Sequence, residues 1–248
     1  NLYTKDAGDE ARIQQIQENT RARAEIAKKL SPKGAPSGAQ AYRASTDLED
    51  ENNDWATWVA FAWSGKPFED DELLRMFSRK WNNTQDSFDR QALRAGELER
   101  IKQRLSEVRK IEYVRFPWTH LHAIFRGQVS KPVDKEAYDF TQKSFQLIGD
   151  ACSGSNNVTR SGVRYSLLKD PVFCGLPVAD EAVARRIEEA RSSKGVELGY
   201  TVYAKIAGVE GVNIKLVPVA VDYQVYEQTY NDPRPEELLA EVSHWPYQ

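Results

Sequence analysis

The chain has 248 residues, of which 40% are hydrophobic and 29% are charged, and its formal net charge at pH 7 is −3. This length is enough to bury an ample core in one large domain, or in one domain with a helical appendage. The composition is that of a soluble globular protein, and without a basic excess it argues against nucleic acid as a partner. No apolar run approaches the roughly 20 residues that a membrane helix needs, so we expect no transmembrane segment.

The first 39 residues predict a polar helix and a linker. Residues 10–30 are rich in Ala, Arg, Gln, Glu and Lys, which favour helix, but their apolar stripe is thin. Residues 31–39, SPKGAPSGA, contain two prolines and two glycines, which is typical of a flexible connector. We therefore expect residues 1–39 to form a polar N-terminal helix and linker, and residues 40–248 to form a single α+β domain.

Three helices are predicted between Asp54 and Lys110. Asp54 can cap a short helix that ends at Ser64 and Gly65. A second helix is expected from Pro67 to about Lys80, with acidic residues in its first turn and basic residues near its end, as the helix dipole favours. A third helix is expected over residues 86–110, where apolar residues recur at helical spacing.

After Lys110 the pattern changes from helical to alternating. Residues 111–116, 121–125 and 140–148 are predicted strands, and residues 179–193 are a predicted helix. Every even position from Val196 to Ile206 is apolar or aromatic, which is typical of a half-buried antiparallel strand. In the next strand the apolar face changes at Val217 and Pro218, so we predict a β-bulge there. The predicted fold class is α+β: N-terminal helices followed by a mainly antiparallel sheet with one interposed helix.

Cys152 and Cys174 are the only cysteines, and they flank a polar, turn-rich segment. One local pair of cysteines is typical of a protein from an oxidising compartment. A disulfide that closes a loop of this length would stabilise the fold by about 3 kcal/mol, because it lowers the conformational entropy of the unfolded chain. We predict a disulfide with a Cα separation of about 5 to 6 Å. Residues 153–173 would form a surface excursion in which Val163, Tyr165 and Leu167 add a short edge strand. The alternative is two separate buried thiols.

The only methionine is Met76, so the chain begins at Asn1 without an initiator residue. Together with the cysteine pair, this leads us to expect a periplasmic or secreted protein whose signal peptide has been removed. A trimmed chain would begin in the same way.

His120 and His122 form the one arrangement that invites a metal-based mechanism. Residues two apart on a strand project from the same face, so the two imidazoles can hold one Zn²⁺ ion. Two ligands do not complete a site, and the only other histidine is His244. A third ligand would have to be a carboxylate such as Asp139 or Asp150. The alternative interpretation is a pair of polar side chains on the solvent face of a strand.

The sequence lacks the GxGxxG, GxxxxGK[ST], GxSxG, HExxH and CxxC motifs. Their absence argues against the familiar nucleotide-binding, α/β-hydrolase, zincin and thioredoxin chemistries. Tryptophan side chains can stack on a sugar or on a proline of a bound peptide. Aromatic residues at helical spacing more often form core. The tryptophans in question are Trp55, Trp58, Trp63, Trp81 and Trp118.

Several short segments resemble a known group of proteins: residues 86–89 (DSFD), 138–140 (YDF) and 145–147 (FQL), and the alternating strands after the helix near Ala179. They are similar to an uncharacterised group of bacterial exported proteins defined only as a domain of unknown function. The resemblance covers about residues 75–228. The group has no assigned activity, so the resemblance implies export and no catalytic residue.

These observations lead to two hypotheses. The first is a non-enzymatic exported bacterial protein that binds a partner protein or a small ligand without a cofactor, with the N-terminal helix as a tether or docking arm. The second is a metal-dependent hydrolase that holds zinc through His120 and His122. The sequence leaves the ligand and the oligomeric state open.

Overall fold

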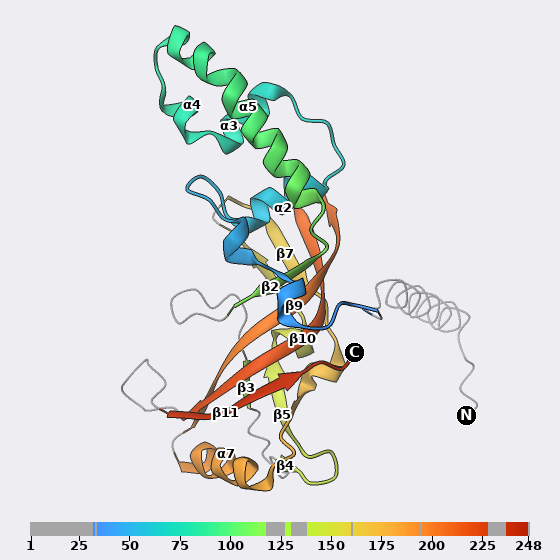
Figure 1. Cartoon of the computed structure of the whole chain (residues 1–248). Helices are drawn as coiled ribbons and strands as arrows, with labels where there is room; N and C mark the ends of the chain where they lie inside the picture. The colour runs from blue at the N-terminus through green and yellow to red at the C-terminus, as the bar shows by residue number, and fades with distance from the viewer. Residues whose placement is uncertain are drawn as a thin grey trace, which may run out of the picture.

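The computed structural model describes residues 32, 34–117, 127–129, 138–159, 161–193, 195–227 and 237–247. It has the predicted α+β class: helices come first, and a large mixed sheet and a small antiparallel sheet follow. The molecule is elongated, with a helical region at one end and a single helix, α7, at the other (Figure 1). In the described ranges, no helix is both long enough and apolar enough to cross a membrane.

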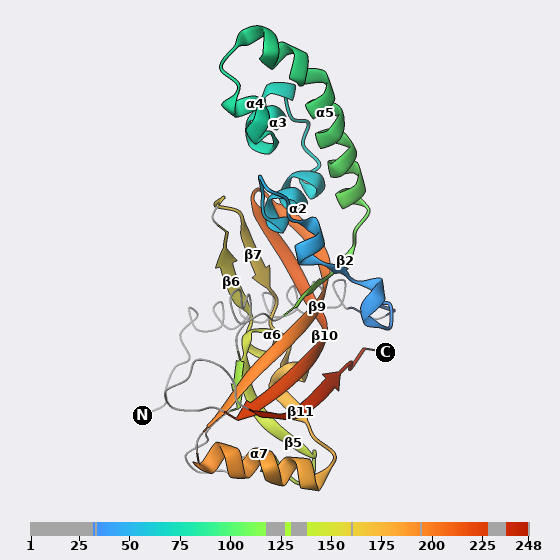
Figure 2. The same ribbon diagram turned by 60° about the vertical axis from the view of Figure 1, so that its left-hand side comes forward.

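The helical region projects beyond one end of the large sheet (Figures 1 and 2). It confirms the predicted first and third helices nearly residue for residue. Their N-caps also agree: the Asp54 carboxylate accepts a hydrogen bond from the Thr57 N–H, and the Asp86 carboxylate accepts from Phe88 and Asp89. The helices are α2 (Trp55–Trp63), α3 (Asp70–Phe77), α4 (Arg79–Asn83) and α5 (Ser87–Arg109).

The predicted second helix is instead two helices that meet at Ser78. The backbone of Ser78 is extended, with φ −124° and ψ 93°, so α3 ends there and α4 begins. The Ser78 hydroxyl accepts from the Trp81 N–H at 3.1 Å and donates to the Glu97 carboxylate of α5 at 2.7 Å. A contact with a distant helix therefore stabilises the break, and helical periodicity alone does not reveal such a contact.

Among the described residues, the large sheet has seven strands, in the order β1-β2-β9-β10-β7-β6 with β11 also paired to β10. The β1–β2 and β7–β10 pairs are parallel, and the other pairs are antiparallel. The strands are β1 (Arg43–Ala44), β2 (Tyr113–Phe116), β6 (Ser155–Val158), β7 (Arg164–Leu167), β9 (Val196–Glu210), β10 (Asn213–Glu227) and β11 (Glu237–His244).

The long β9–β10 hairpin forms the centre of this sheet, and it confirms the predicted change of face. Pro218 is opposite Ala204 and Ala220 is opposite Tyr203, so Val219 is the extra residue of a bulge. Pro218 also lies between the two stretches of β10 that pair with β7 and with β11. Its missing N–H therefore costs no ladder hydrogen bond on that side.

The small sheet is built around β5, which pairs antiparallel with three other strands. Its side chains alternate: Phe145 and Leu147 are buried, whereas Gln146 and Ile148 are exposed. The sequence predicted one strand over residues 140–148, but a turn separates β4 from β5, and Lys143 has a positive φ of 49° in it. The elements are β3 (Gly127–Val129), β4 (Tyr138–Asp139), β5 (Ser144–Gly149) and β8 (Gly175–Pro177).

Residues 153–173 contribute to the core as well as to the surface, so the predicted surface excursion was wrong in part. Val163, Tyr165 and Leu167 are buried, and β7 lies inside the large sheet against β10, with β6 as the edge strand. At the hairpin turn, the Ser161 hydroxyl hydrogen-bonds Asp54 at 3.1 Å and Thr57 at 2.7 Å. The hairpin therefore also contacts the start of α2.

Two groups of apolar side chains pack on the large sheet. The larger includes Trp55 and Trp58 of α2, which are 3% and 0% exposed, so these tryptophans form core. The smaller group surrounds Tyr42, whose ring meets those of Tyr203 and Trp245 edge-on at 5.2 and 5.8 Å. Ala35 and Ala39 pack against this second group, so the end of the predicted linker contacts the sheet.

Candidate functional site beside the disulfide

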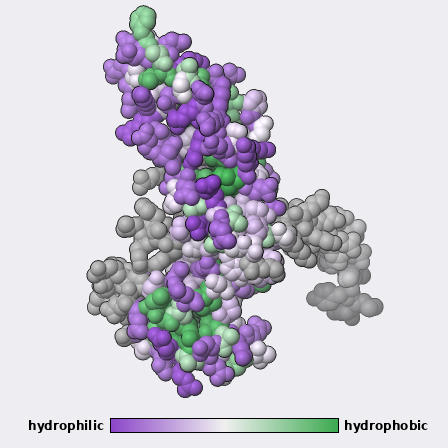
Figure 3. Space-filling view, viewed as in Figure 1, coloured by the Kyte–Doolittle hydropathy of each residue, from purple (hydrophilic) through white to green (hydrophobic). Residues whose placement is uncertain are grey.

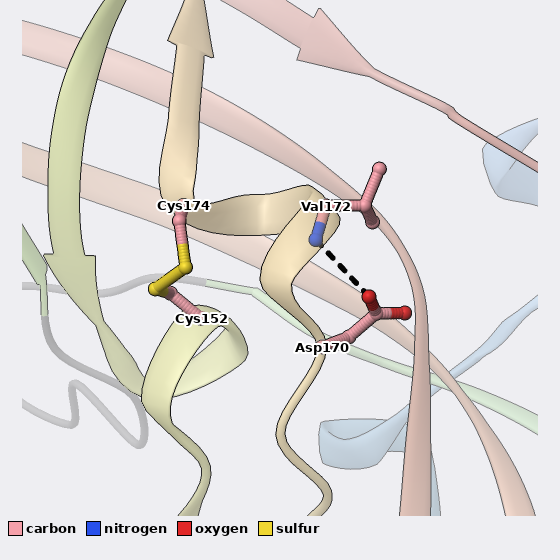
Figure 4. Close-up of a disulfide and its surroundings, with 4 residues drawn as sticks. All are labelled: Cys152, Asp170, Val172 and Cys174. Atoms are coloured by element: carbon pink, nitrogen blue, oxygen red, sulfur yellow. Dashed lines mark hydrogen bonds between the residues drawn. A yellow bond between two sulfur atoms is a disulfide. The ribbon is translucent and has the colours of Figure 1, made fainter. Parts of the chain in front are cut away.

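Cys152 and Cys174 form the predicted disulfide, with their Cα atoms 4.7 Å apart (Figure 4). Cys152 lies in the short helix α6 (Asp150–Ser153), directly after β5, and Cys174 ends the 3₁₀ helix η3 (Pro171–Cys174), directly before β8. The separation is slightly shorter than the predicted 5 to 6 Å and lies within the range that disulfides adopt. The bond therefore links the two segments that flank the small sheet.

Asp170 organises the segment that carries Cys174. Its carboxylate accepts a hydrogen bond from the Val172 N–H at 3.1 Å and so caps η3 (Figure 4). Its own N–H donates to the Ala151 carbonyl at 3.1 Å, and the Tyr247 hydroxyl donates to its carboxylate. Burial, and then the hydrogen bond to Asp170, raise the pKa of Tyr247 above its usual range.

His244, at the end of β11, approaches the same segment. Its ring meets that of Phe173 edge-on, with centroids 5.4 Å apart. Burial lowers the pKa of His244, and the nearby Asp170 carboxylate opposes that shift only in part. The imidazole is therefore neutral near neutral pH. Sequence reasoning noted His244 only as the third histidine, because the chain neighbours of His244 give no sign of the packing on Phe173.

A hollow of about 620 Å³ lies beside the disulfide, on the side of Cys174. Its floor is the outer face of β5, where Ser144 lies opposite Pro177 and Gln146 lies opposite Gly175. Gly175 leaves room there because it has no side chain. The other lining residues are Asp139, Gln142, Phe145, Pro171, Val172, Cys174 and His244.

The polar groups of the hollow are suited to hydrogen bonding. Within the described ranges, the side chains of Gln142, Ser144 and Gln146 make no hydrogen bond to the protein. The Asp139 carboxylate, in contrast, is engaged by the backbone N–H groups of Thr141 and Gln142 at 2.8 and 2.9 Å. The floor therefore presents uncharged donors and acceptors to a ligand, beside a neutral imidazole.

The opposite side of the disulfide is closed. Cys152 is only 9% exposed and borders a cavity of about 10 Å³ that Phe173, Tyr200 and Tyr223 also line. Such a space holds at most one water molecule. Burial raises the pKa of both tyrosines far above the usual value, so they stay protonated. The open side at Cys174 is thus the side from which a ligand can reach the bond.

The predicted metal ligands His120 and His122 lie outside the described residues. Over the ranges that the structure describes, no group of three or more His, Cys, Asp or Glu side chains is placed to hold a metal ion. Asp139 and Asp150, the suggested third ligands, do lie in these ranges, at the end of β4 and the start of α6. The zinc hypothesis stays a prediction, to be tested by metal analysis of untagged protein and of a His120→Ala variant.

Comparison of the chain with protein-family models, with curated proteins and with solved structures finds no match.

Proposed function

We propose that the chain is an exported bacterial protein without enzymatic activity, which binds a neutral segment of a partner protein in the hollow beside the disulfide. The observation that carries the proposal is the floor of the hollow, where Ser144 and Gln146 present hydrogen-bonding groups that no described residue occupies. Such groups are well placed to pair with the backbone of an extended peptide. The floor carries no charged side chain, and the one carboxylate that lines the hollow, of Asp139, already accepts two backbone N–H groups, so a neutral segment fits better than an acidic one.

The disulfide supports the exported location, because such bonds persist in oxidising compartments. The segments around the disulfide are held rigidly, which also favours binding, because a rigid site loses less conformational entropy when it holds a ligand. The disulfide, the cap from Asp170 and the packing of His244 on Phe173 supply such a frame.

A Gly175→Val variant tests the proposal. Gly175 has an extended backbone, with φ −121° and ψ 137°, and an added Cβ would meet only Ser144 atoms at 3.6 and 3.7 Å. Valine should therefore be accepted in β8 while its methyl groups fill the floor of the hollow. Proteins that co-purify from the native compartment should be identified by mass spectrometry for the wild type and for this variant.

We expect one partner to be retained by the wild type and lost by Gly175→Val at an unchanged melting temperature. A Val212→Ala variant, which trims an exposed residue of the β9–β10 turn outside the hollow, serves as a control for nonspecific surface effects and should retain the partner. A partner that the wild type and Gly175→Val retain equally would contradict binding in the hollow. Turnover of an ester, amide, glycoside or phosphate substrate, abolished by changing one polar residue, would contradict the non-enzymatic assignment.

A further inference from the structure

A groove of about 370 Å³ lies along the outer edge of β11, the edge that faces away from β10. β11 passes just above α7 (Glu181–Ser193) in Figures 1 and 2, and Arg186 of α7 is ion-paired with Glu237 at the start of the strand. The surface near α7 and β11 shows more hydrophobic area than the helical end does (Figure 3). Residues 240–243 of β11 form one wall of the groove. The end of β8 and the start of α7 form the other wall: Pro177, Val178, Ala179, Asp180 and Val183.

The outer edge of β11 has backbone groups that no other described strand pairs with. β11 is eight residues long, and its partner in the large sheet is β10. In the described ranges, no backbone hydrogen bond joins the other side of β11 to a neighbouring segment. Alternate residues of an antiparallel edge strand direct both their N–H and their C=O groups away from the sheet. Such an edge can accept a further strand, and strand addition is a recurrent mode of peptide recognition.

The second wall and the charge of the groove favour a single peptide strand over a second copy of this chain. A second β11 would bring its own β10 and α7 with it, and these would meet the wall formed by residues 177–183. The charged residues of the lining, Asp180 and Glu241, are both acidic. A second β11 would add further carboxylates, of Glu237 and Glu241, to this lining.

The side chains of the groove specify the sequence pattern of the added strand. Ala240 and Val242 lie on one face of β11 and pack, with Val183 of α7, against the core, whereas Glu241 is exposed on the other face. Side chains that lie opposite each other on neighbouring strands share a face. Apolar residues of the added strand would therefore contact Ala240 and Val242, and a basic residue would lie beside Glu241. Asp180 is already engaged, because its carboxylate accepts from two backbone N–H groups of α7 at 2.8 and 3.3 Å.

We propose that the outer edge of β11 binds the partner segment as an added β-strand in which apolar residues alternate with at least one Lys or Arg. The groove and the hollow are continuous, since Pro177 lines both, and Ser243 in the groove is followed by His244 in the hollow. The segment that is neutral in the hollow therefore continues along β11 with a basic residue beside Glu241. This inference rests on the proposed binding of a partner segment, and it deepens that proposal by naming the backbone pairing and the sequence pattern.

A random library of peptides of about ten residues, displayed on phage and selected on the immobilised full chain, supplies the probe. This length is enough to span the eight residues of β11. We expect the enriched peptides to share apolar residues that alternate around a basic one. In hydrogen exchange with an enriched peptide, residues 240–243 should be protected.

Two N-methylated versions of an enriched peptide, each methylated at one set of alternate residues, test the backbone pairing. The version whose methyl groups face β11 should bind at least about tenfold more weakly, because it loses two or more hydrogen bonds. The other version should bind like the unmethylated peptide, since its methyl groups point away from β11.

A charge reversal tests the predicted basic residue. Glu241→Arg should weaken binding of the unmethylated peptide about three- to tenfold, because repulsion replaces attraction beside the basic residue. The matched control is Glu99→Arg on α5, which makes the same change in net charge at an exposed position outside the groove and should leave binding unaltered.

The Gly175→Val variant separates strand addition from binding in the hollow. Peptides that Gly175→Val no longer binds, but whose two methylated versions bind equally well to the wild type, would leave the hollow as a binding site and overturn strand addition. Binding that depends on one set of backbone N–H groups and persists in Gly175→Val would support strand addition and contradict the hollow. A selection that enriches no peptide, or a bound peptide that leaves residues 240–243 unprotected, would overturn the inference.

Discussion

The helical region and the disulfide-linked segment are held in place by contacts of different kinds. In the helical region, side chains cap the helices, and exposed ion pairs such as Lys102–Asp70 join α5 to α3. Residues 153–173 instead depend on a covalent bond, on the parallel pairing of β7 with β10, and on the Tyr165 ring, which packs on Trp55 at 5.1 Å.

This difference shows where each region is vulnerable. Exposed ion pairs contribute little to stability, so the helical region depends mainly on buried side chains between its helices, such as Trp58, Phe77 and Ile101. The disulfide-linked segment is held by the buried strand β7 as well as by the covalent bond. Loss of the bond should therefore leave β7 in the sheet. Substitutions in the two regions can separate these effects.

The largest effect is expected at Trp58, in the helical region. The side chain is 0% exposed, and its ring lies 4.2 Å from that of Phe77 in α3. Trp58→Ala should lower the free energy of unfolding by about 3–5 kcal/mol, because a large cavity replaces the indole. Urea unfolding followed by circular dichroism measures the change. Phe88→Ala is the control, because Phe88 is 83% exposed and its loss should cost at most about 0.5 kcal/mol.

The second effect concerns the disulfide. Replacing both cysteines, in Cys152→Ser/Cys174→Ser, should cost about 3 kcal/mol through the freedom gained by the unfolded chain. The fold should persist, because Tyr165 and Leu167 remain buried in the large sheet. Hydrogen exchange should therefore quicken in α6 and η3 while β7 stays protected. Loss of protection in β7 would show that the covalent bond, and not its strand neighbours, holds the segment.

The same two regions show how far the sequence predicts the fold. Asp54, Asp86 and the alternating residues of β9 were sufficient to place helices and strands, because caps and periodicity are local signals. The break at Ser78 was missed because its partner Glu97 lies 19 residues away. The position of β7 inside the sheet was missed because neighbouring residues do not specify which strand pairs in parallel with it.

The candidate site was predictable to the same limited extent. The cysteine pair followed from composition and spacing, and the structure confirms it. The hollow could not be predicted from the sequence, because its floor and walls come from β5, η3, β8 and the end of β11, which only the tertiary fold brings together. Gly175 and His244 have no local signal that marks them as neighbours.

A smaller effect is expected where the two regions touch. Asp54 caps α2 at Thr57 and also accepts from Ser161 in the β6–β7 turn, at 2.8 and 3.1 Å. Asp54→Ala should therefore cost about 1–2 kcal/mol, whereas Asp86→Ala, which removes only a helix cap, should cost about 1 kcal/mol or less. A double-mutant cycle with Ser161→Ala isolates the link between the regions. If the effects of Asp54→Ala and Ser161→Ala on the free energy of unfolding are strictly additive, the Asp54–Ser161 hydrogen bond contributes nothing to stability.

The smallest effect is a pH dependence at the disulfide-linked segment. Burial lowers the pKa of His244 in the folded protein, although Asp170 opposes the shift. The unfolded state, with a histidine pKa near 6.5, then binds more protons as the pH falls, so folding stability decreases below about pH 6.5. Urea midpoints at about pH 7.5 and about pH 5.5 should differ less in His244→Gln than in the wild type. A His120→Gln/His122→Gln control should keep the contribution of His244. Should His244→Gln leave the difference between the midpoints unchanged, the imidazole would be as solvated in the folded protein as in the unfolded chain, and its packing on Phe173 would not affect its protonation.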